Sequence, residues 1–135
     1  MIYLDHTATT KPYPEVIETL AVAMKEDYYN PASMYQAGLK LARARKDLFN
    51  QLGEDLGCSG ENLIQTSGAT ESTNMAFKGL YSKYGKRLNE LVVLRSDHHA
   101  TFETAKFLES QGAKVHYLEP DRQGHLPPEC LLRVL

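Results

Sequence analysis

The stretch Leu91-Val92-Val93-Leu94-Arg95-Ser96-Asp97-His98-His99 decides the fold that we expect for this chain. Its first four residues form a continuous apolar run, which is typical of a strand buried on both faces of a parallel sheet. Residues 100–111 follow with apolar side chains at helical spacing and stop at Gly112, and residues 114–118 read as another strand. A strand, a helix and a second strand in this order predict a right-handed βαβ unit.

The same alternation extends towards the start of the chain. Leu63-Ile64-Gln65-Thr66 reads as a short strand, and residues 70–81 read as the helix that follows it. We therefore expect an α/β fold with a mostly parallel sheet flanked by helices, in which residues 61–135 form a βαβαβ unit.

Helices without strands are predicted before residue 60. Pro14 opens the first helix, because proline tolerates the first helical position. Ser33 is the expected N-cap of a long second helix, and Gly53 is its expected end. Residues 1–60 are thus expected to form an N-terminal arm and helices. A last short helix is predicted from Pro127 onwards.

The composition restricts the classes of protein to which the chain can belong. It has 135 residues, 42% of them hydrophobic and 24% charged, with a formal net charge of -2, which is the balance of a globular protein. The strong basic excess of a nucleic-acid binder is missing, and no stretch approaches the roughly 18 apolar residues of a membrane span. Cys58 and Cys130 lack the spacing of a zinc site or a disulfide framework. We expect a cytoplasmic protein that binds no nucleic acid, membrane or metal.

The polar segment Thr66-Ser67-Gly68-Ala69-Thr70-Glu71 lies between a predicted strand and the next helix. Ligands of open parallel sheets bind at the carboxyl ends of the strands, where this segment falls. Gly68 allows a tight turn, and the first backbone amides of a helix suit a phosphate group. The same residues are also typical of a plain helix cap, so the spacing alone leaves a phosphate site and a helix cap equally open.

A second polar segment, Ser96-Asp97-His98-His99, follows the next strand and is expected at the same edge of the sheet. A histidine at this place can stack on an aromatic cofactor or move protons near neutral pH. A polar loop and a metal-ligating pair are the alternatives. No further ligands stand at metal spacing, which disfavours the metal.

Together with two polar stretches near the start of the chain, these segments resemble the N-terminal portion of the NifS/IscS-like cysteine desulfurases, in the class V aminotransferase family of enzymes that use pyridoxal 5'-phosphate (PLP). The matching pieces are Tyr3-Leu4-Asp5 with Ala8-Thr9-Thr10, Asn30-Pro31-Ala32-Ser33, Thr66-Ser67-Gly68-Ala69-Thr70-Glu71-Ser72 with Asn74, and Asp97-His98. They cover nearly the whole chain in the family's order. The chain departs from the pattern at Tyr35, Thr73 and His99, where histidine, aspartate and lysine are frequent.

The resemblance implies an incomplete part of the large domain of a fold-type I PLP-dependent transferase. It implies that Ala69 and Thr70 contact the cofactor phosphate and that His98 stacks on the pyridine ring and takes part in proton transfer. Such enzymes convert L-cysteine to L-alanine, pass the sulfur on as a persulfide for iron–sulfur clusters or thiolated molecules, and form homodimers. The expected partners are therefore L-cysteine, a sulfur acceptor such as an iron–sulfur scaffold protein, and a second subunit.

The family's Schiff-base lysine and persulfide cysteine lie beyond the matched region, so we expect the isolated chain to be inactive. Neither Cys58 nor Cys130 is expected to be the persulfide cysteine. Two alternatives remain: a selenocysteine lyase or another class V aminotransferase, and a non-catalytic fragment that associates with itself.

Overall fold

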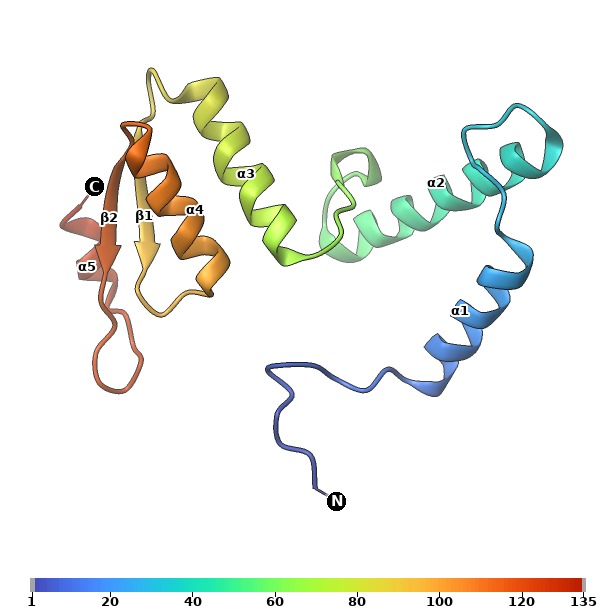
Figure 1. The fold of residues 1–135 in the computed structure, drawn as a ribbon, viewed down its shortest axis with the longest axis horizontal. Helices are drawn as coiled ribbons and strands as arrows, with labels where there is room; N and C mark the ends of the chain where they lie inside the picture. The colour runs from blue at the N-terminus through green and yellow to red at the C-terminus, as the bar shows by residue number, and fades with distance from the viewer. Residues whose placement is uncertain (1, 135) are drawn as a thin grey trace. The chain divides into compact units, whose positions relative to one another are not determined.

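The computed structural model describes residues 2–134, and the chain forms two compact units (Figure 1). One unit ends at Ile64 and the other begins at Gln65. The first unit is helical, and the second contains helices together with a small sheet. The predicted α/β class is confirmed, while the predicted domain boundary between residues 60 and 61 stays a prediction.

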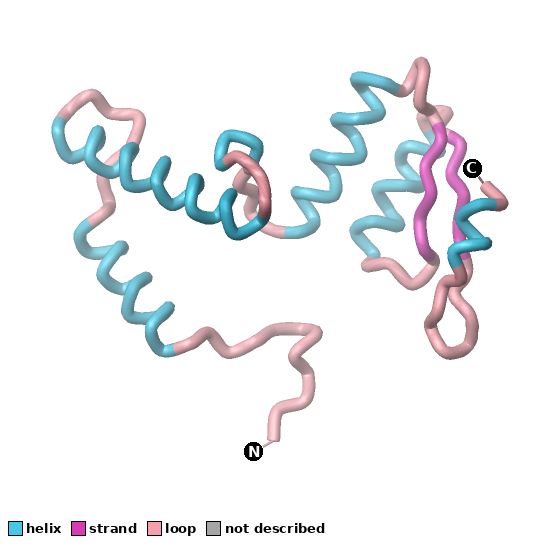
Figure 2. The backbone as a smooth tube through the Cα atoms, turned by 180° about the vertical axis from the view of Figure 1, so that it is seen from behind, coloured by secondary structure: helices cyan, strands magenta, loops and turns pink. Residues whose placement is uncertain are grey.

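The second unit is built around a pair of parallel strands, β1 (Glu90–Leu94) and β2 (Lys114–Leu118). Figure 2 shows the two strands side by side, with Leu91 opposite Val115 and Val93 opposite Tyr117 in the register. Helix α4 (His99–Ser110) connects them and packs against both strands. It is followed by Gly112, whose φ of 99° lies in the left-handed region that favours glycine. The βαβ unit predicted from residue 91 onwards is confirmed.

The buried core of this unit lies between α4 and the sheet. Strand residues Val93 and Leu118 meet helix residues Ala105 and Leu108, and each of these side chains is less than 9% exposed. The Phe102 ring on α4 lies 5.3 Å from the Tyr117 ring on β2. Apolar burial of this kind is the main stabilising term for the unit, because the two strands alone would be marginal in water.

Helix α3 (Ala69–Tyr84) forms where a helix was predicted over residues 70–81, and it packs beside α4. A short helix, α5 (Pro128–Leu132), follows Pro127 where a last helix was expected. No helix within residues 2–134 is both long enough and apolar enough to cross a membrane.

The strand predicted at residues 63–66 does not form, which corrects the expected βαβαβ order. Leu63 has extended backbone angles, φ -88° and ψ 130°, but the sheet of the described residues contains only β1 and β2. A β-strand requires a hydrogen-bonded neighbour, so an extended apolar segment without one remains a connection.

The first unit contains α1 (Pro14–Glu26), α2 (Gln36–Leu56) and the single 3₁₀ turn η1 (Gly60–Asn62). Pro14 begins α1 as predicted. Two predicted ends of the second helix were wrong, because Tyr35 rather than Ser33 is its N-cap and the helix continues past Gly53 to Leu56. Gly53 is buried inside the helix, and a Cβ there would lie 2.6 Å from the backbone nitrogen of Gly60. This glycine therefore allows η1 to approach α2 closely, and Gly57, with φ 70°, is the glycine that ends the helix.

Candidate functional site

A cavity of about 430 Å³ lies between α3 and α4 in the second unit. Thr70 contributes to it from the first turn of α3, and His98 contributes from the N-cap of α4. The complete lining is Thr70, Asn74, Lys78, His98, His99, Ala100, Glu103, Thr104 and Phe107. Two of the three residues predicted for the site are thus brought together, and Ala69, the first residue of α3, directly precedes Thr70.

Unpaired backbone donors stand at the start of α3. The first intrahelical hydrogen bond here runs from the Ser72 N–H to the Gly68 carbonyl at 3.1 Å. The N–H groups of Ala69, Thr70 and Glu71 have no acceptor within residues 2–134. Such donors, with the positive end of the helix dipole, attract an anionic group.

Gly68 does not make the tight turn that the sequence predicted. Its angles, φ 164° and ψ 178°, are those of extended backbone that any residue adopts. A Cβ at this position would meet nothing within 4 Å. Open space around Gly68 leaves room beside the unpaired amides, but the glycine itself is not required by the local backbone.

The Glu71 carboxylate already binds two donors at this helix end. Its Oε2 accepts from the Ser67 N–H at 2.6 Å and from the Ser67 hydroxyl at 2.7 Å. The backbone bond and then the hydroxyl bond hold the pKa of Glu71 below its ordinary value. The helix-cap interpretation is therefore wrong in its detail, because Gly68 is the N-cap of α3 and no side chain caps the helix; the Ser67–Glu71 bonds link the residue before the N-cap to the first turn instead. An incoming anion would find Ala69 and Thr70 available and Ser67 occupied.

His98 caps α4 with its ring. Its Nδ1 accepts from the Ala100 N–H at 3.1 Å, and the side chain is otherwise exposed. A ring nitrogen that accepts a hydrogen bond carries no proton, so in the neutral imidazole the proton sits on Nε2. This arrangement fixes the tautomer and leaves Nε2 as the atom that can hold or release a proton. Within residues 2–134, no group of His, Cys, Asp and Glu side chains has the arrangement of a metal site.

Charged side chains that the sequence analysis did not single out complete the cavity wall. The Lys78 ammonium lies 4.5 Å from the centre of the Phe107 ring, a cation–π contact. Glu103 accepts from Lys106 at 2.9 Å, and that bond lowers the pKa of Glu103. Lys78 follows Thr70 and Asn74 at steps of four residues, so helical spacing alone places these three on one face of α3. That spacing is the signal by which Lys78 could have been found.

The polar segments nearer the start of the chain belong to the first unit. The Asn30 side chain accepts from the Ala32 N–H at 2.9 Å, and the Tyr3 hydroxyl donates to the carbonyl oxygens of Asp5 and Thr9. Both sets of bonds are local, as in ordinary turns.

Comparisons with known proteins identify the family. The family model for class-V aminotransferases matches residues 2–135. The cysteine desulfurase IscS of Dictyoglomus turgidum is 34% identical over 134 residues, which cover 99% of this chain and 34% of that protein. A solved structure described as a NifS-like protein is 30% identical and superposes with a TM-score of 0.89 over 95% of this chain and 35% of its own. A structure of SspA in complex with cysteine gives a TM-score of 0.89 at 28% identity, covering 98% of this chain and 38% of that one.

The chain spans about a third of the length of the curated relatives that it matches. The resemblance to cysteine desulfurases that Thr66–Ser72 and Asp97–His98 indicated is therefore confirmed over nearly the entire sequence. The chain belongs to the class-V aminotransferase family, among relatives that are cysteine desulfurases.

Proposed function

We propose that this chain is the cofactor-binding portion of a PLP-dependent cysteine desulfurase. The observation that carries the proposal is that Thr70 and His98 line one cavity, beside backbone amides that have no acceptor in the described part of the chain. A phosphate-bearing aromatic ring needs donors for its phosphate and a flat surface for its ring, and these two residue types supply both.

The phosphate of PLP would be held by the N–H groups of Ala69 and Thr70 and by the Thr70 hydroxyl. Those amides belong to the first turn of α3, where the helix dipole favours negative charge. The Glu71 carboxylate repels an anion, but its charge is directed to the two donors of Ser67. The donor set therefore fits a phosphate at the Ala69 side of the turn.

His98 would lie against the pyridine ring. When it is bound, PLP acts as the electron sink for bond cleavage next to the amino group of the substrate. The Ala100 N–H fixes Nδ1, so the His98 ring is oriented and Nε2 can take up or deliver a proton.

We infer that the substrate of the whole enzyme is L-cysteine and that its sulfur passes through a persulfide to an iron–sulfur scaffold or a thiolated molecule, with L-alanine as product. The names of the relatives and the cysteine-bound SspA support cysteine as substrate over selenocysteine. Alanine formation from each of the two amino acids in the complete enzyme would decide between a desulfurase and a selenocysteine lyase.

We further propose that these 135 residues alone do not desulfurate cysteine, since the matched motifs contain no Schiff-base lysine and no persulfide cysteine. Cys58 and Cys130 are unpaired and lie outside the cavity. Release of alanine from cysteine by the isolated chain, together with a borohydride-sensitive yellow PLP band, would refute this.

Binding of the cofactor is tested by nuclear magnetic resonance. PLP is titrated into the labelled chain, and the expected result is that the amide signals of Ala69 and Thr70 and the ring signals of His98 move together with one apparent Kd. Thr70→Val removes the hydroxyl and His98→Asn removes the ring, so each is expected to weaken binding about three- to tenfold, which is the order of one hydrogen bond or ring contact.

Ser110→Ala, on the last turn of α4, is the matched control, because its hydroxyl bonds only to the Phe107 carbonyl within the helix. It is expected to leave the Kd unchanged. Perturbations confined to lysines elsewhere, with Ala69, Thr70 and His98 unmoved, would contradict the proposed site.

A non-catalytic, self-associating role is favoured by one observation. Apolar side chains of α1 are exposed, with Leu20 57% and Met24 80% accessible within the described residues. Apolar patches of this kind mark interaction surfaces. A mass by light scattering that stays at that of one chain up to high concentration would count against this role.

A further inference from the structure

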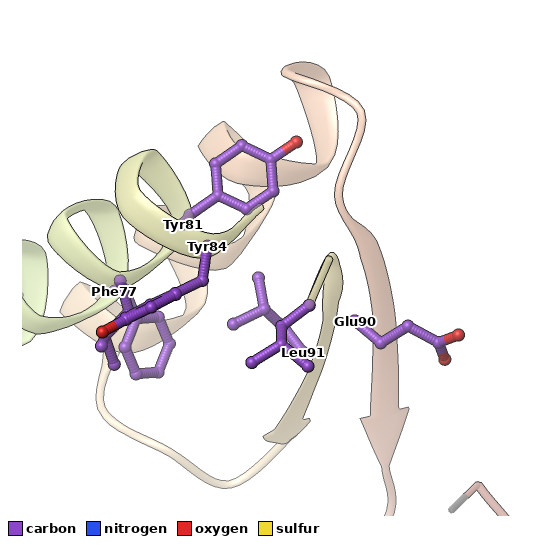
Figure 3. A pocket seen from close by; sticks show the side chains of 7 residues that line it. Phe77, Tyr81, Tyr84, Glu90 and Leu91 are labelled. Carbon is purple, nitrogen blue, oxygen red and sulfur yellow. The ribbon is translucent and has the colours of Figure 1, made fainter. Parts of the chain in front are cut away.

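Side chains tie both ends of strand β1 to β2. At the start of β1, the Glu90 carboxylate binds His116 at 2.7 Å. Figure 3 shows that the Glu90 side chain is directed away from the aromatic residues of α3. Just past the end of β1, the Arg95 Nε lies 3.0 Å from the Glu119 carboxylate. The chain is therefore still held at β2 where it enters the loop that leads to α4.

The guanidinium group of Arg95 lies over two aromatic rings. Its central carbon is 4.9 Å from the centre of the Tyr117 ring on β2 and 5.7 Å from the centre of the Phe102 ring on α4. The centres of the two rings are 5.3 Å apart, and both side chains are half-buried. The Arg95 N–H also donates to the Leu118 carbonyl at 2.9 Å. Arg95 thus joins the loop to both α4 and β2.

The two rings hold Arg95 more firmly than the ion pair does. The Arg95 and Glu119 side chains are 48% and 70% exposed, and an ion pair at such a surface contributes little. A planar guanidinium stacks on aromatic faces, which adds dispersion to the cation–π attraction. Because Phe102 belongs to the first turn of α4, this stack holds that turn against the sheet.

The first turn of α4 in turn holds the His98 ring. The His98 carbonyl accepts from the N–H groups of Thr101 and Phe102 at 2.9 and 3.3 Å, and the His98 Nδ1 accepts from the Ala100 N–H at 3.1 Å. Helix ends open more readily than helix centres, since fewer hydrogen bonds hold each residue there. When this turn opens, Nδ1 loses its donor and the imidazole can carry its proton on either nitrogen.

We propose that Arg95 is a positioning residue for His98. Its stack on the two rings keeps the first turn of α4 closed, and the closed turn holds the imidazole of His98 with its proton on Nε2. Arg95 lies outside the set of residues that line the cavity, so its effect on a ligand passes through His98. The part of this inference that concerns PLP rests on the proposed function, whereas the orientation of the ring is a property of the chain alone.

The tautomer of His98 tests the first step without any ligand. Nitrogen-15 chemical shifts of the two ring nitrogens, measured at about pH 8.5, well above the ordinary pKa of histidine, give the ratio of the Nε2–H to the Nδ1–H form. Arg95→Met removes the guanidinium and is expected to lower this ratio about two- to fivefold, the size of a partly lost hydrogen bond. Arg122→Met, at an exposed arginine in the loop after β2, is the matched control and is expected to leave the ratio unchanged.

Arg95→Lys separates the ring stack from the ion pair. Lysine keeps the positive charge opposite Glu119 but has no planar group to lie over the rings, so we expect the ratio to fall about as far as in Arg95→Met. A lysine variant with the ratio of the unmodified chain, or an unchanged ratio in Arg95→Met, would overturn the proposal. A general loss of the amide signals of the sheet in Arg95→Met would also overturn it, because Arg95 would then support the fold and not one ring.

The second step is tested with PLP by a double-mutant cycle. Arg95→Met is expected to raise the Kd of PLP about two- to fivefold in the unmodified chain, and by less than about twofold in the His98→Asn background, because the ring through which it acts is gone. An equal rise in both backgrounds would overturn the proposal, since Arg95 would then act on the ligand without His98. If PLP does not bind to the unmodified chain, the proposed function fails, and the tautomer ratio still decides the role of Arg95.

Discussion

Glu71 and His98 each form a local hydrogen bond at the start of a helix that borders the cavity, but only His98 caps its helix. The His98 ring accepts from Ala100, and the Glu71 carboxylate accepts from Ser67. These bonds leave the amides of Ala69 and Thr70 as the donors without acceptors in the described part of the chain. An anion would therefore bind at the amides of Ala69 and Thr70, because Glu71 already occupies the donors of Ser67.

Replacing Ser67 with alanine is predicted to raise the pKa of Glu71 towards its ordinary value. The hydroxyl bond is lost and the backbone bond remains, so the rise is partial. Because the pKa of Glu71 is depressed in the folded chain, the stabilising contribution of its bonds to Ser67 is present above the unfolded pKa and is lost as the pH falls through the folded pKa. Carbon-13 titration of the Glu71 carboxyl in both proteins measures the change. Identical titration curves would mean that the Ser67 hydroxyl does not bind this carboxylate in solution.

Among the elements, two glycines inside helices have opposite surroundings. A Cβ at Gly53 would lie within 2.7 Å of backbone atoms of Gly60 and Cys58, whereas a Cβ at Gly79 would meet nothing within 4 Å. Gly53 is thus required for the packing of α2 against η1, whereas Gly79 only lowers the stability of α3.

Gly79→Ala is predicted to stabilise α3 by about 0.8–1 kcal/mol, the difference in helix propensity between the two residues. Gly53→Ala is predicted to destabilise the first unit by roughly 1–3 kcal/mol, because backbone must move to admit the methyl group. Urea denaturation followed by circular dichroism measures both. A gain of stability in Gly53→Ala would show that η1 does not pack on α2 in solution.

The carboxylate of Glu90, at the start of β1, links the two strands because it binds His116 and Lys114 of β2. The bond to His116 and then that to Lys114 lower the pKa of Glu90. This stabilising contribution is predicted to be present above the unfolded pKa of Glu90 and to disappear as the pH falls through the folded pKa. Thermal melts between pH 7 and pH 3 are expected to depend less on pH in Glu90→Gln than in the unmodified chain. Equal pH dependence in the two proteins would exclude the contribution.

For the molecule as a whole, stability is predicted to depend on one small core in the second unit. Leu108 is 2% exposed and is the largest side chain that is fully buried in the described residues. Leu108→Ala is expected to cost about 2–5 kcal/mol, which is of the order of the total stability of a small domain. Leu132→Ala, at a position 71% exposed, is the control and is expected to change little. Chemical denaturation of both variants tests this, and equal midpoints would argue against the core described here.

The sequence by itself determined the βαβ unit and the approximate extents of α3 and α4, because helical and strand periodicity are local properties. Ala69, Thr70 and His98 became candidates through their place after predicted strands and through the resemblance to cysteine desulfurases, and their roles stay predictions. Only the tertiary structure decided that Thr70 and His98 share a cavity with Lys78, that Gly53 lies inside α2 against η1, and that residues 63–66 are no strand. The physical reason is that a cavity, a close backbone approach and a strand each need a partner from another part of the chain, and local sequence does not specify which part that is.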